Sequence, residues 1–451
     1  MGSRTDLDLN AAPSQAPLRS RDVLAIAVPM IFSNATVPLV GIVDTAVIGQ
    51  MNDPALAGGV ALGSTIFSLM FWAFGFLRMG TSALTAQAVG AGDATEVSAH
   101  LKRALLLALI AGVTLYLIHV PAVLLTLKLI GGSVQVQTAT SAYFGVRIVS
   151  APATLANYAI VGWFIGRSRA DVAFLLQLFL NLINIAVAVA LVIGAGKGIG
   201  GAASAAAISD YAAAFAGLIL ARKHLKAATN RVFARAAFRK MIAVNADIMA
   251  RTLCLLFAFT FLAAEGARLG DVALAANSVL RALSDLSAYI LDGFAFAAEV
   301  LTGQAIGAGS PARFWKAVRL TSAWASALAI AVSAAFWLCG SMLIPAMTSA
   351  PNVREAAQAL LPWAALTPIA GVACFQLDGI FIGATRTADM RNMMAVSLLI
   401  FLAAWAVLTP RFGNEGLWAS LIVFYFARAL TLATRFPSLV RFIAQKASAS
   451  R

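Results

Sequence analysis

Leu84–Asp93 reads LTAQAVGAGD, and 217 residues later Leu301–Ser310 reads LTGQAIGAGS. Eight of the ten positions agree, counting one exchange of Val for Ile. A second match follows at the same spacing, between FIGRSR (Phe164–Arg169) and FIGATR (Phe381–Arg386). Matches that recur in order at one spacing indicate an internal repeat. We therefore predict that the chain folds as two similar halves.

The composition places these halves in a membrane. Of the 451 residues, 61% are hydrophobic and 12% charged, and the mean hydropathy is +0.86. A soluble domain is about 45–50% apolar and about 25% charged. The apolar runs are long and unbroken, whereas a membrane β-barrel alternates apolar and polar residues over segments of about ten. The sequence therefore predicts membrane-spanning helices.

The hydropathy pattern predicts an all-α integral membrane protein with twelve transmembrane helices in two six-helix lobes. An even number of spans in each half makes the repeats parallel, related by an axis along the membrane normal. Such an arrangement suits alternating access, in which one lobe rocks against the other. The expected spans are residues 23–47, 57–88, 102–127, 138–163, 172–194, 201–221, 241–265, 272–304, 317–344, 356–382, 392–409 and 416–436.

Lysine and arginine set the expected orientation. With the N-terminus in the cytosol, 23 basic residues fall on the inner side and 5 on the outer side. The positive-inside rule thus places both termini in the cytosol, and we expect the bacterial inner membrane. The net charge of +14 is a topological signal that meets anionic lipids, so no nucleic acid is expected. The expected division is an N-terminal tail (1–22), a first lobe (23–225), a basic linker (226–240), a second lobe (241–442) and a C-terminal tail (443–451).

Cysteine and histidine give no sign of catalysis or metal binding. The three Cys lie in apolar runs without CxxC spacing, and the three His are scattered. Neither pattern fits a zinc site or a disulfide framework. We expect no enzyme activity, metal or cofactor, and a monomer whose partners are membrane lipids and a small organic substrate.

Four motifs together resemble one family of transporters. They are VDTAVIG at 43–49, FLRMGTSALTAQAVGAGD at 76–93, DGFAFAAEVLTGQAIGAG at 292–309 and DGIFIGATR at 378–386. The chain resembles the multidrug and toxic compound extrusion (MATE) transporters, in their DinF-like branch, from residue 23 to 442. The resemblance implies two lobes around a central V-shaped cavity. It also implies export of organic, often cationic, compounds against entry of H⁺ or Na⁺.

Asp44 is the acid of the first span, and its sequence neighbours are apolar. A carboxylate at the bilayer centre costs at least ~2.5–3.5 kcal/mol and is a functional candidate by default. No Lys or Arg lies within two turns of it in the sequence. The resemblance implies that this first-helix Asp is a proton or cation site. We expect Asp44 to bind and release the coupling proton.

Neighbouring polar residues and prolines extend this prediction. Asn181 and Asn184 lie in the fifth span, and Asn184 is the expected hydrogen-bond partner of Asp44. Many relatives have an Asp four residues after the second Asn, but this chain has Ala188. The missing carboxylate argues weakly against Na⁺, which prefers several hard oxygens. Pro29 and Pro38 each remove a backbone hydrogen bond and permit a kink in the first helix.

Further charges lie in the other spans. Asp285, Asp292 and Glu299 are seven residues apart and so share a helix face. At the offset of 217, the counterparts of Asp292, Glu299 and Asp378 in the first half are uncharged residues. The two lobes are therefore expected to have different roles, with proton coupling in the first and cargo binding in the second. Internal pairing, for instance of Arg281 with Asp285, is the alternative for each acid. The candidate cavity residues are Asp210, Asp292, Glu299, Asp378 and Arg78.

The predicted function is a proton-coupled antiporter for organic compounds. A Na⁺-coupled exporter remains open, as does a flippase for lipid-linked precursors from the same superfamily. The flippase is disfavoured on the expectation that intramembrane acids outnumber buried bases. A passive channel is disfavoured because the two lobes carry unequal charges.

Overall fold

The computed structural model describes residues 17–49, 54–130 and 133–449, and for 37–48, 54, 129–130 and 449 the backbone alone. The described residues form helices joined by short turns, with no strand among them, so the all-α prediction is confirmed. The first half contains α1 (Ser20–Gly49), α2 (Pro54–Ala73), α3 (Phe76–Gly90), α4 (Ala94–Ile130), α5 (Val134–Arg147), α6 (Ala151–Gly166), α7 (Ala170–Ala188), the π-helix η2 (Val189–Gly194), α8 (Gly198–Leu220) and the short α9 (Arg222–Lys226). The second half contains α10 (Arg235–Arg268), α11 (Asp271–Gly307), α12 (Pro311–Met347), α13 (Pro351–Gly383), α14 (Thr387–Ala433) and α15 (Phe436–Ala449).

The helices account for the twelve expected spans. Within the described residues, ten segments are long and apolar enough to cross a membrane. One of them, Thr387–Ser448, contains the last two expected spans, because α14 turns at Gly413, where φ is 56°. The thirty-residue α1 is the remaining span.

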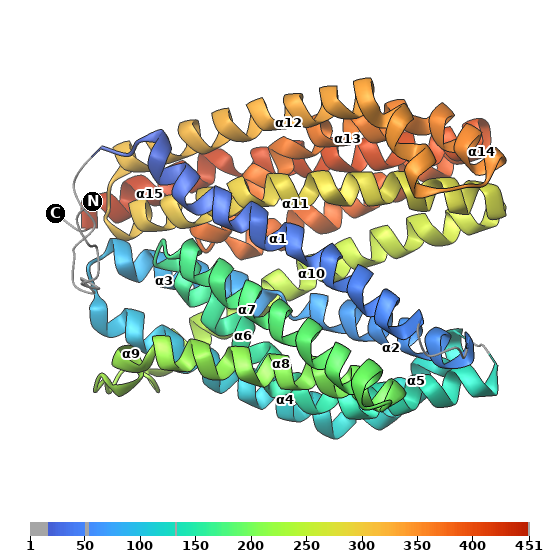
Figure 1. The fold of residues 1–451 in the computed structure, drawn as a ribbon. Coiled ribbons are helices and arrows are strands. Elements are labelled where there is room, and N and C mark those ends of the chain that lie inside the picture. Colours follow the sequence, from blue (N-terminus) through green and yellow to red (C-terminus); the bar gives the residue numbers. More distant parts are fainter. Residues whose placement is uncertain (1–16, 50–53, 131–132, 450–451) are drawn as a thin grey trace, which may run out of the picture.

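The two halves form two helix bundles that lie side by side (Figure 1). In the first lobe α6 packs against α3 and α4, and α2 packs against α5. In the second lobe α13 packs against α11, α12 and α14. The start of α1 and the helix α15 lie at the left-hand end of the view in Figure 1, where α3, α6, α11 and α13 also end.

The repeat seen in the sequence is reproduced in backbone packing. A Cβ added to Gly162 of α6 would lie 2.3 Å from the carbonyl oxygen of Arg78 in α3. A Cβ added to Gly379 of α13 would lie 2.3 Å from the carbonyl oxygen of Ala295 in α11. Both pairs of residues are related by the offset of 217, so each lobe uses glycine to bring the same two helices into backbone contact.

Two helices, α1 and α10, cross from one lobe to the other. α1 packs against α11, where a Cβ on Gly293 would lie 2.8 Å from the carbonyl oxygen of Ala27. In the equivalent contact α10 packs against α3, where a Cβ on Gly80 would lie 2.0 Å from Oδ1 of Asn245. Each of these helices also packs within its own lobe, α1 against α7 and α10 against α14, so both connect the two lobes.

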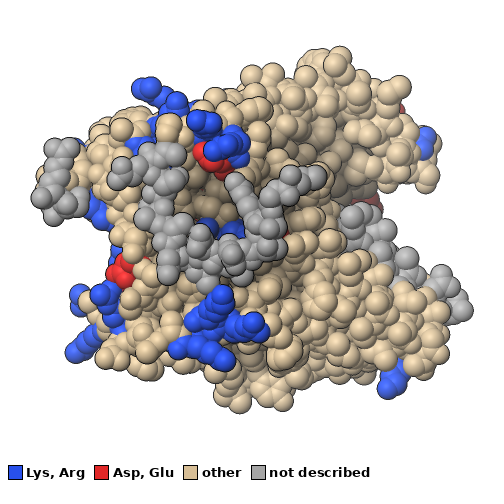
Figure 2. Space-filling view, turned by 60° about the vertical axis from the view of Figure 1, so that its left-hand side comes forward, with Lys and Arg blue, Asp and Glu red and all other residues tan. Residues whose placement is uncertain are grey.

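One end of the molecule is strongly basic. Figure 2, turned to bring the left-hand end of Figure 1 forward, shows Lys and Arg gathered over both lobes there. The exposed side chains of α9 and of the start of α10 contribute to this end, which we call the basic end. Its basic residues include Arg222, Lys223, Lys226, Arg235 and Arg239.

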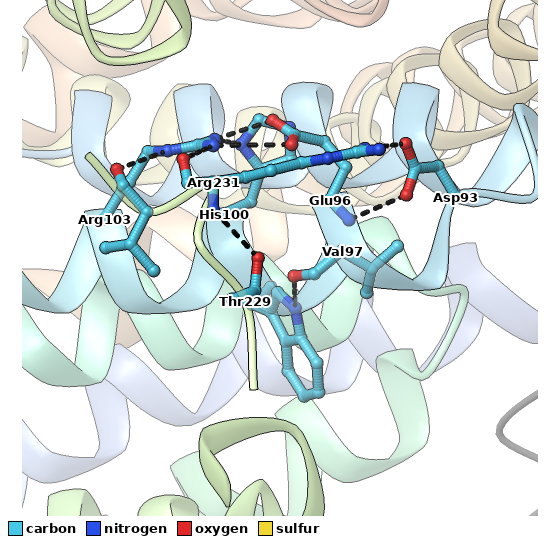
Figure 3. A network of polar contacts seen from close by, with 9 residues as sticks. Asp93, Glu96, Val97, His100, Arg103, Thr229 and Arg231 are labelled. Carbon is cyan, nitrogen blue, oxygen red and sulfur yellow. Dashed lines mark hydrogen bonds and ion pairs between the residues drawn. The ribbon is translucent and has the colours of Figure 1, made fainter. Parts of the chain in front are cut away.

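The connection between the lobes is bound to the first lobe (Figure 3). Arg103 of α4 is fully buried and pairs with Glu96 at 2.7 Å. Its guanidinium also donates to the carbonyl oxygens of Arg231 at 2.6 Å and Val232 at 3.0 Å. The side chain of Arg231 reaches Asp93 at 2.5 Å. The segment between α9 and α10, residues 227–234, is therefore bound to the first lobe, and we call it the strap. Helix α10 begins at Arg235, inside the segment expected to be a linker, because its first turns project beyond the apolar span.

Candidate functional site

The first-lobe site predicted around Asp44 is described only in part. The side chains of Asp44 and Pro38 lie outside the described residues, although the backbone of both belongs to α1. Pro29 is half-buried, and α1 continues as a helix through it. The roles of Asp44 and of the two prolines therefore stay predictions.

The two asparagines of α7 are buried beside α1. Asn181 and Asn184 are each 6% exposed. Nδ2 of Asn181 donates a 2.8 Å hydrogen bond to Oγ1 of Thr36 in α1, and Oδ1 of Asn181 accepts from Nε2 of Gln177 at 3.1 Å. The polar face of α7 therefore contacts α1, as the prediction of a shared site requires.

Asp210 is held inside the first lobe. Its Oδ2 atom lies 2.6 Å from Nη1 of Arg147, and it accepts hydrogen bonds from Ser150 at 3.0 Å and Thr154 at 2.8 Å. The guanidinium of Arg147 also lies over the ring of Phe67, 4.2 Å from its centroid. This is the internally paired arrangement, which leaves Asp210 little capacity to bind cargo.

Asp378 is bound by two arginines inside the second lobe. Its Oδ2 atom contacts Nη2 of Arg251 from α10 and lies 2.7 Å from Nη2 of Arg428 in α14. All three side chains are less than a tenth exposed. Two guanidinium groups outnumber the one carboxylate they contact, because Arg stays protonated in proteins, and Asp292 is a second acid near both arginines. The Nε atoms of both arginines have no hydrogen-bond partner among the described residues.

Arg78, Asp292 and Glu299 meet where the lobes face each other. Arg78 projects from α3 of the first lobe and lies over the ring of Phe296 in α11, 4.7 Å from its centroid. Glu299 of α11 is 2% exposed, and its Oε1 atom has no hydrogen-bond partner in the described part of the chain. Asp292 is half-buried on the same helix, and Arg78 is an electrostatic neighbour of both acids. Asp378, with Arg251 and Arg428, is a further electrostatic neighbour of Asp292, so these predicted residues lie in one region, whereas Asp210 is bound elsewhere.

Arginines accompany the acids inside the spans. Among the described side chains, the acids Asp210, Asp285, Asp292, Glu299 and Asp378 are matched in number by the arginines Arg78, Arg147, Arg251, Arg281 and Arg428. Arg281 binds Asp285 at 2.8 Å, which is the pairing that the sequence allowed. Of these arginines only Arg251 and Arg428 are buried, so the expectation that intramembrane acids outnumber buried bases is not contradicted. A long arginine side chain can reach an acid on another helix.

Sequence reasoning missed the partners of Asp210 and Asp378. Arg147 is 63 residues from Asp210, and Arg251 is 127 residues from Asp378. An arginine inside an apolar span was the available signal, since such a charge needs a partner. In the described ranges, no group of three His, Cys, Asp or Glu lies close enough to hold a metal ion.

Comparisons with known proteins agree with this architecture. The family model MatE matches residues 29–190 and 248–406, one stretch in each lobe. The chain is 41% identical over 414 residues to DNA damage-inducible protein F of Escherichia coli (strain K12), which covers 90% of both chains. It is 25% identical to a probable multidrug resistance protein NorM of Agrobacterium fabrum, over 93% of both chains. Among solved structures, a MATE protein described in its bent conformation matches with a TM-score of 0.88 and 18% identity, over 98% of both chains.

Proposed function

Because the chain belongs to the MatE family of multidrug and toxic compound extrusion transporters, we propose that it exports organic cations or amphiphiles in exchange for protons. The protein is a multi-pass membrane transporter and not an enzyme. In this proposal the lobes alternate access to a site between them, the first lobe couples the proton and the second lobe binds the cargo. The coupling ion is H⁺, and no cofactor is needed.

The observation that carries the proposal is the polar contact between α1 and α7. Both helices start at the basic end and run away from it, and Thr36 bonds Asn181. Asp44 lies eight residues beyond Thr36, about 12 Å along α1. Seven residues beyond Asn181, about 10 Å along α7, the helix reaches Ala188 and passes into the π-helix η2, which contacts α1. Single π-turns concentrate at functional sites, so the backbone beside Asp44 supports a coupling role.

The second lobe offers a binding region for positive charge. Asp292 and Glu299 share one electrostatic neighbour from the first lobe, Arg78. Asp292 also has Arg251 and Arg428 as electrostatic neighbours, so Glu299 depends most on Arg78, and we infer that an organic cation takes the place of Arg78 beside Glu299. Because Arg78 belongs to the other lobe, a movement of the lobes changes the charge that faces the cargo.

A second candidate is a flippase for lipid-linked precursors. The observation that favours it is the pair of buried guanidinium groups, of Arg251 and Arg428, that share Asp378. A phosphate group would be bound by such guanidinium groups. Reconstituted protein that moves fluorescent phospholipids or polyprenyl phosphates across vesicles, without moving organic cations, would establish this candidate instead.

We place the basic end in the cytosol of the bacterial inner membrane, with both termini on that side. The distribution of Lys and Arg supports this orientation. We further propose that the functional unit is a monomer, since each chain contains both lobes, and that anionic lipids surround the basic end.

The proposal is tested by efflux from vesicles. Wild-type protein, Asp44→Asn and the control Asp285→Asn are reconstituted, and efflux of a fluorescent organic cation is followed under an imposed pH gradient. Asp285 is a suitable control because its side chain is 45% exposed and paired with Arg281 in the same helix. We expect the gradient to accelerate efflux by wild type and Asp285→Asn, and Asp44→Asn to bind cargo but ignore the gradient. Equal acceleration of all three, or acceleration by a Na⁺ gradient alone, would contradict the proposal.

A further inference from the structure

Two glutamines join the lobes at the basic end by equivalent contacts. Gln87 of α3 donates to the carbonyl oxygen of Gly383 at 2.9 Å and to Oγ1 of Thr385 at 3.2 Å, both in the second lobe. Gln304 of α11 donates to the carbonyl oxygen of Gly166 at 3.4 Å and to Oγ of Ser168 at 2.8 Å, both in the first lobe. Every residue in one set is 217 positions from its counterpart in the other. Both glutamine side chains are more than nine-tenths buried.

The accepting turns are built for this contact. Ser168 and Thr385 follow the ends of α6 and α13 and have φ of 58° and 53°. This left-handed conformation is costly for residues other than glycine, and for a β-branched residue such as Thr in particular. At each of these positions the residue has a side-chain hydroxyl, which a glycine would lack. The hydroxyl oxygen accepts a hydrogen bond from the glutamine amide. The left-handed backbone at Ser168 and Thr385 therefore accompanies a hydrogen bond to the opposite lobe.

The helices that carry the glutamines touch each other through their backbones. A Cβ on Gly90 of α3 would lie 2.0 Å from the carbonyl oxygen of Gln304. A Cβ on Gly307 of α11 would lie 2.0 Å from the carbonyl oxygen of Gln87. This contact is as close as the chain permits, so the basic end is closed in this conformation. A separation of α3 from α11 must break the glutamine bonds as well.

We propose that Gln87 and Gln304 are positioning residues of the transport cycle, which hold the lobes together at the basic end and must release their four bonds before cargo enters from that side. The inference rests on the proposed alternating access. It also accounts for the two motifs that repeat most strongly: one contains the glutamine and its glycine, and the other contains the turn that accepts the bond. The intramembrane charges do not repeat, but the contact between the lobes does.

The test measures the distance between the lobes without cargo or a pH gradient. Spin labels are placed at Thr95→Cys and Ala312→Cys, exposed positions related by the offset of 217, in protein whose native cysteines are replaced. Gln87→Met and Gln304→Met keep the length of the side chain and remove the amide. Since a buried hydrogen bond is worth roughly a factor of ten in an equilibrium, we expect each to raise the ratio of separated to closed lobes by about tenfold. The double variant should shift the ratio further.

Two other variants separate this role from general stability. Ser333→Ala removes a buried hydrogen bond to the carbonyl oxygen of Ala365 within the second lobe, and it should leave the lobe distance unchanged. Thr385→Ser retains the accepting hydroxyl and should also match the wild type. If both methionine variants fold and show the wild-type distance distribution, the inference is wrong. If the distances shift but vesicle efflux ignores a pH gradient, the glutamine contact stands and proton coupling fails.

Discussion

At the scale of single residues, arginine determines which intramembrane acids can bind a proton or cargo. Asp210 and Asp378 each have an arginine partner within the same lobe. Glu299 has an oxygen with no hydrogen-bond partner among the described residues and faces an arginine of the other lobe. The acids look equivalent in the sequence, but the structure divides them into two groups. Acids paired with an arginine of their own lobe have a structural role, and acids that face an arginine of the other lobe are the candidates for function.

Asp378→Asn should strongly destabilise the protein, because it leaves Arg251 and Arg428 buried without a counter-charge. Removing one partner of a buried ion pair costs about 3–5 kcal/mol. The corresponding change at the half-exposed Asp285 should cost no more than about 1 kcal/mol. Thermal unfolding of both variants in detergent measures the difference. A midpoint for Asp378→Asn equal to that of Asp285→Asn would show that the two arginines have other partners.

At the scale of elements, short α9 and the strap that follows it bind to the end of the first lobe. His224 of α9 lies 2.9 Å from Oγ of Ser98, and its ring meets that of Trp163 edge to face at 4.8 Å between centroids. Burial, together with the charge of Arg167, lowers the pKa of His224 to about 4. This contact therefore requires a neutral imidazole.

Acid should loosen the attachment of α9. An unfolded His has a pKa of about 6.5, so between about pH 6.5 and 4 the unfolded chain binds the proton more readily than the folded chain does. The contribution of His224 to stability is thus present above pH 6.5 and is lost as the pH falls toward 4. Unfolding midpoints of wild type and His224→Gln, compared at pH 7.5 and pH 5, measure this contribution. A wild-type midpoint that falls no more than that of the variant would refute the assignment.

The sequence was sufficient for the helices and the repeat but not for contacts between helices. Spans could be predicted because apolar length is a local property, and Gln87 and Gln304 lie in the very motifs that reveal the repeat. Their bonds could not be predicted, because nothing local indicates that Ser168 and Thr385 lie across the interface between lobes. The arginine partners of Asp210 and Asp378 were missed for the same reason. Boundaries differ where helices continue beyond the apolar span, as at Arg235.

At the scale of the whole molecule, the lobes combine a symmetric scaffold with asymmetric charge. The equivalent glutamine contacts join the lobes at the basic end, and helices α1 and α10 each contact both lobes. The asymmetric residues Asp44 in one lobe and Asp292 with Glu299 in the other carry the proposed coupling and binding. Glu299 lies closest to the glutamine contact, because its carbonyl oxygen approaches Gly383. Protonation of one lobe can therefore change cargo binding in the other through a common movement.

The most direct test of this coupling reverses the driving force. Vesicles containing the protein and a pH-sensitive dye are given a gradient of organic cation with no pH gradient, and the internal pH is recorded. The account predicts that cargo moving one way drives protons the other way through the wild type, and that Asp44→Asn abolishes the pH change. Cargo movement through the wild type without any change of internal pH would contradict the central claim.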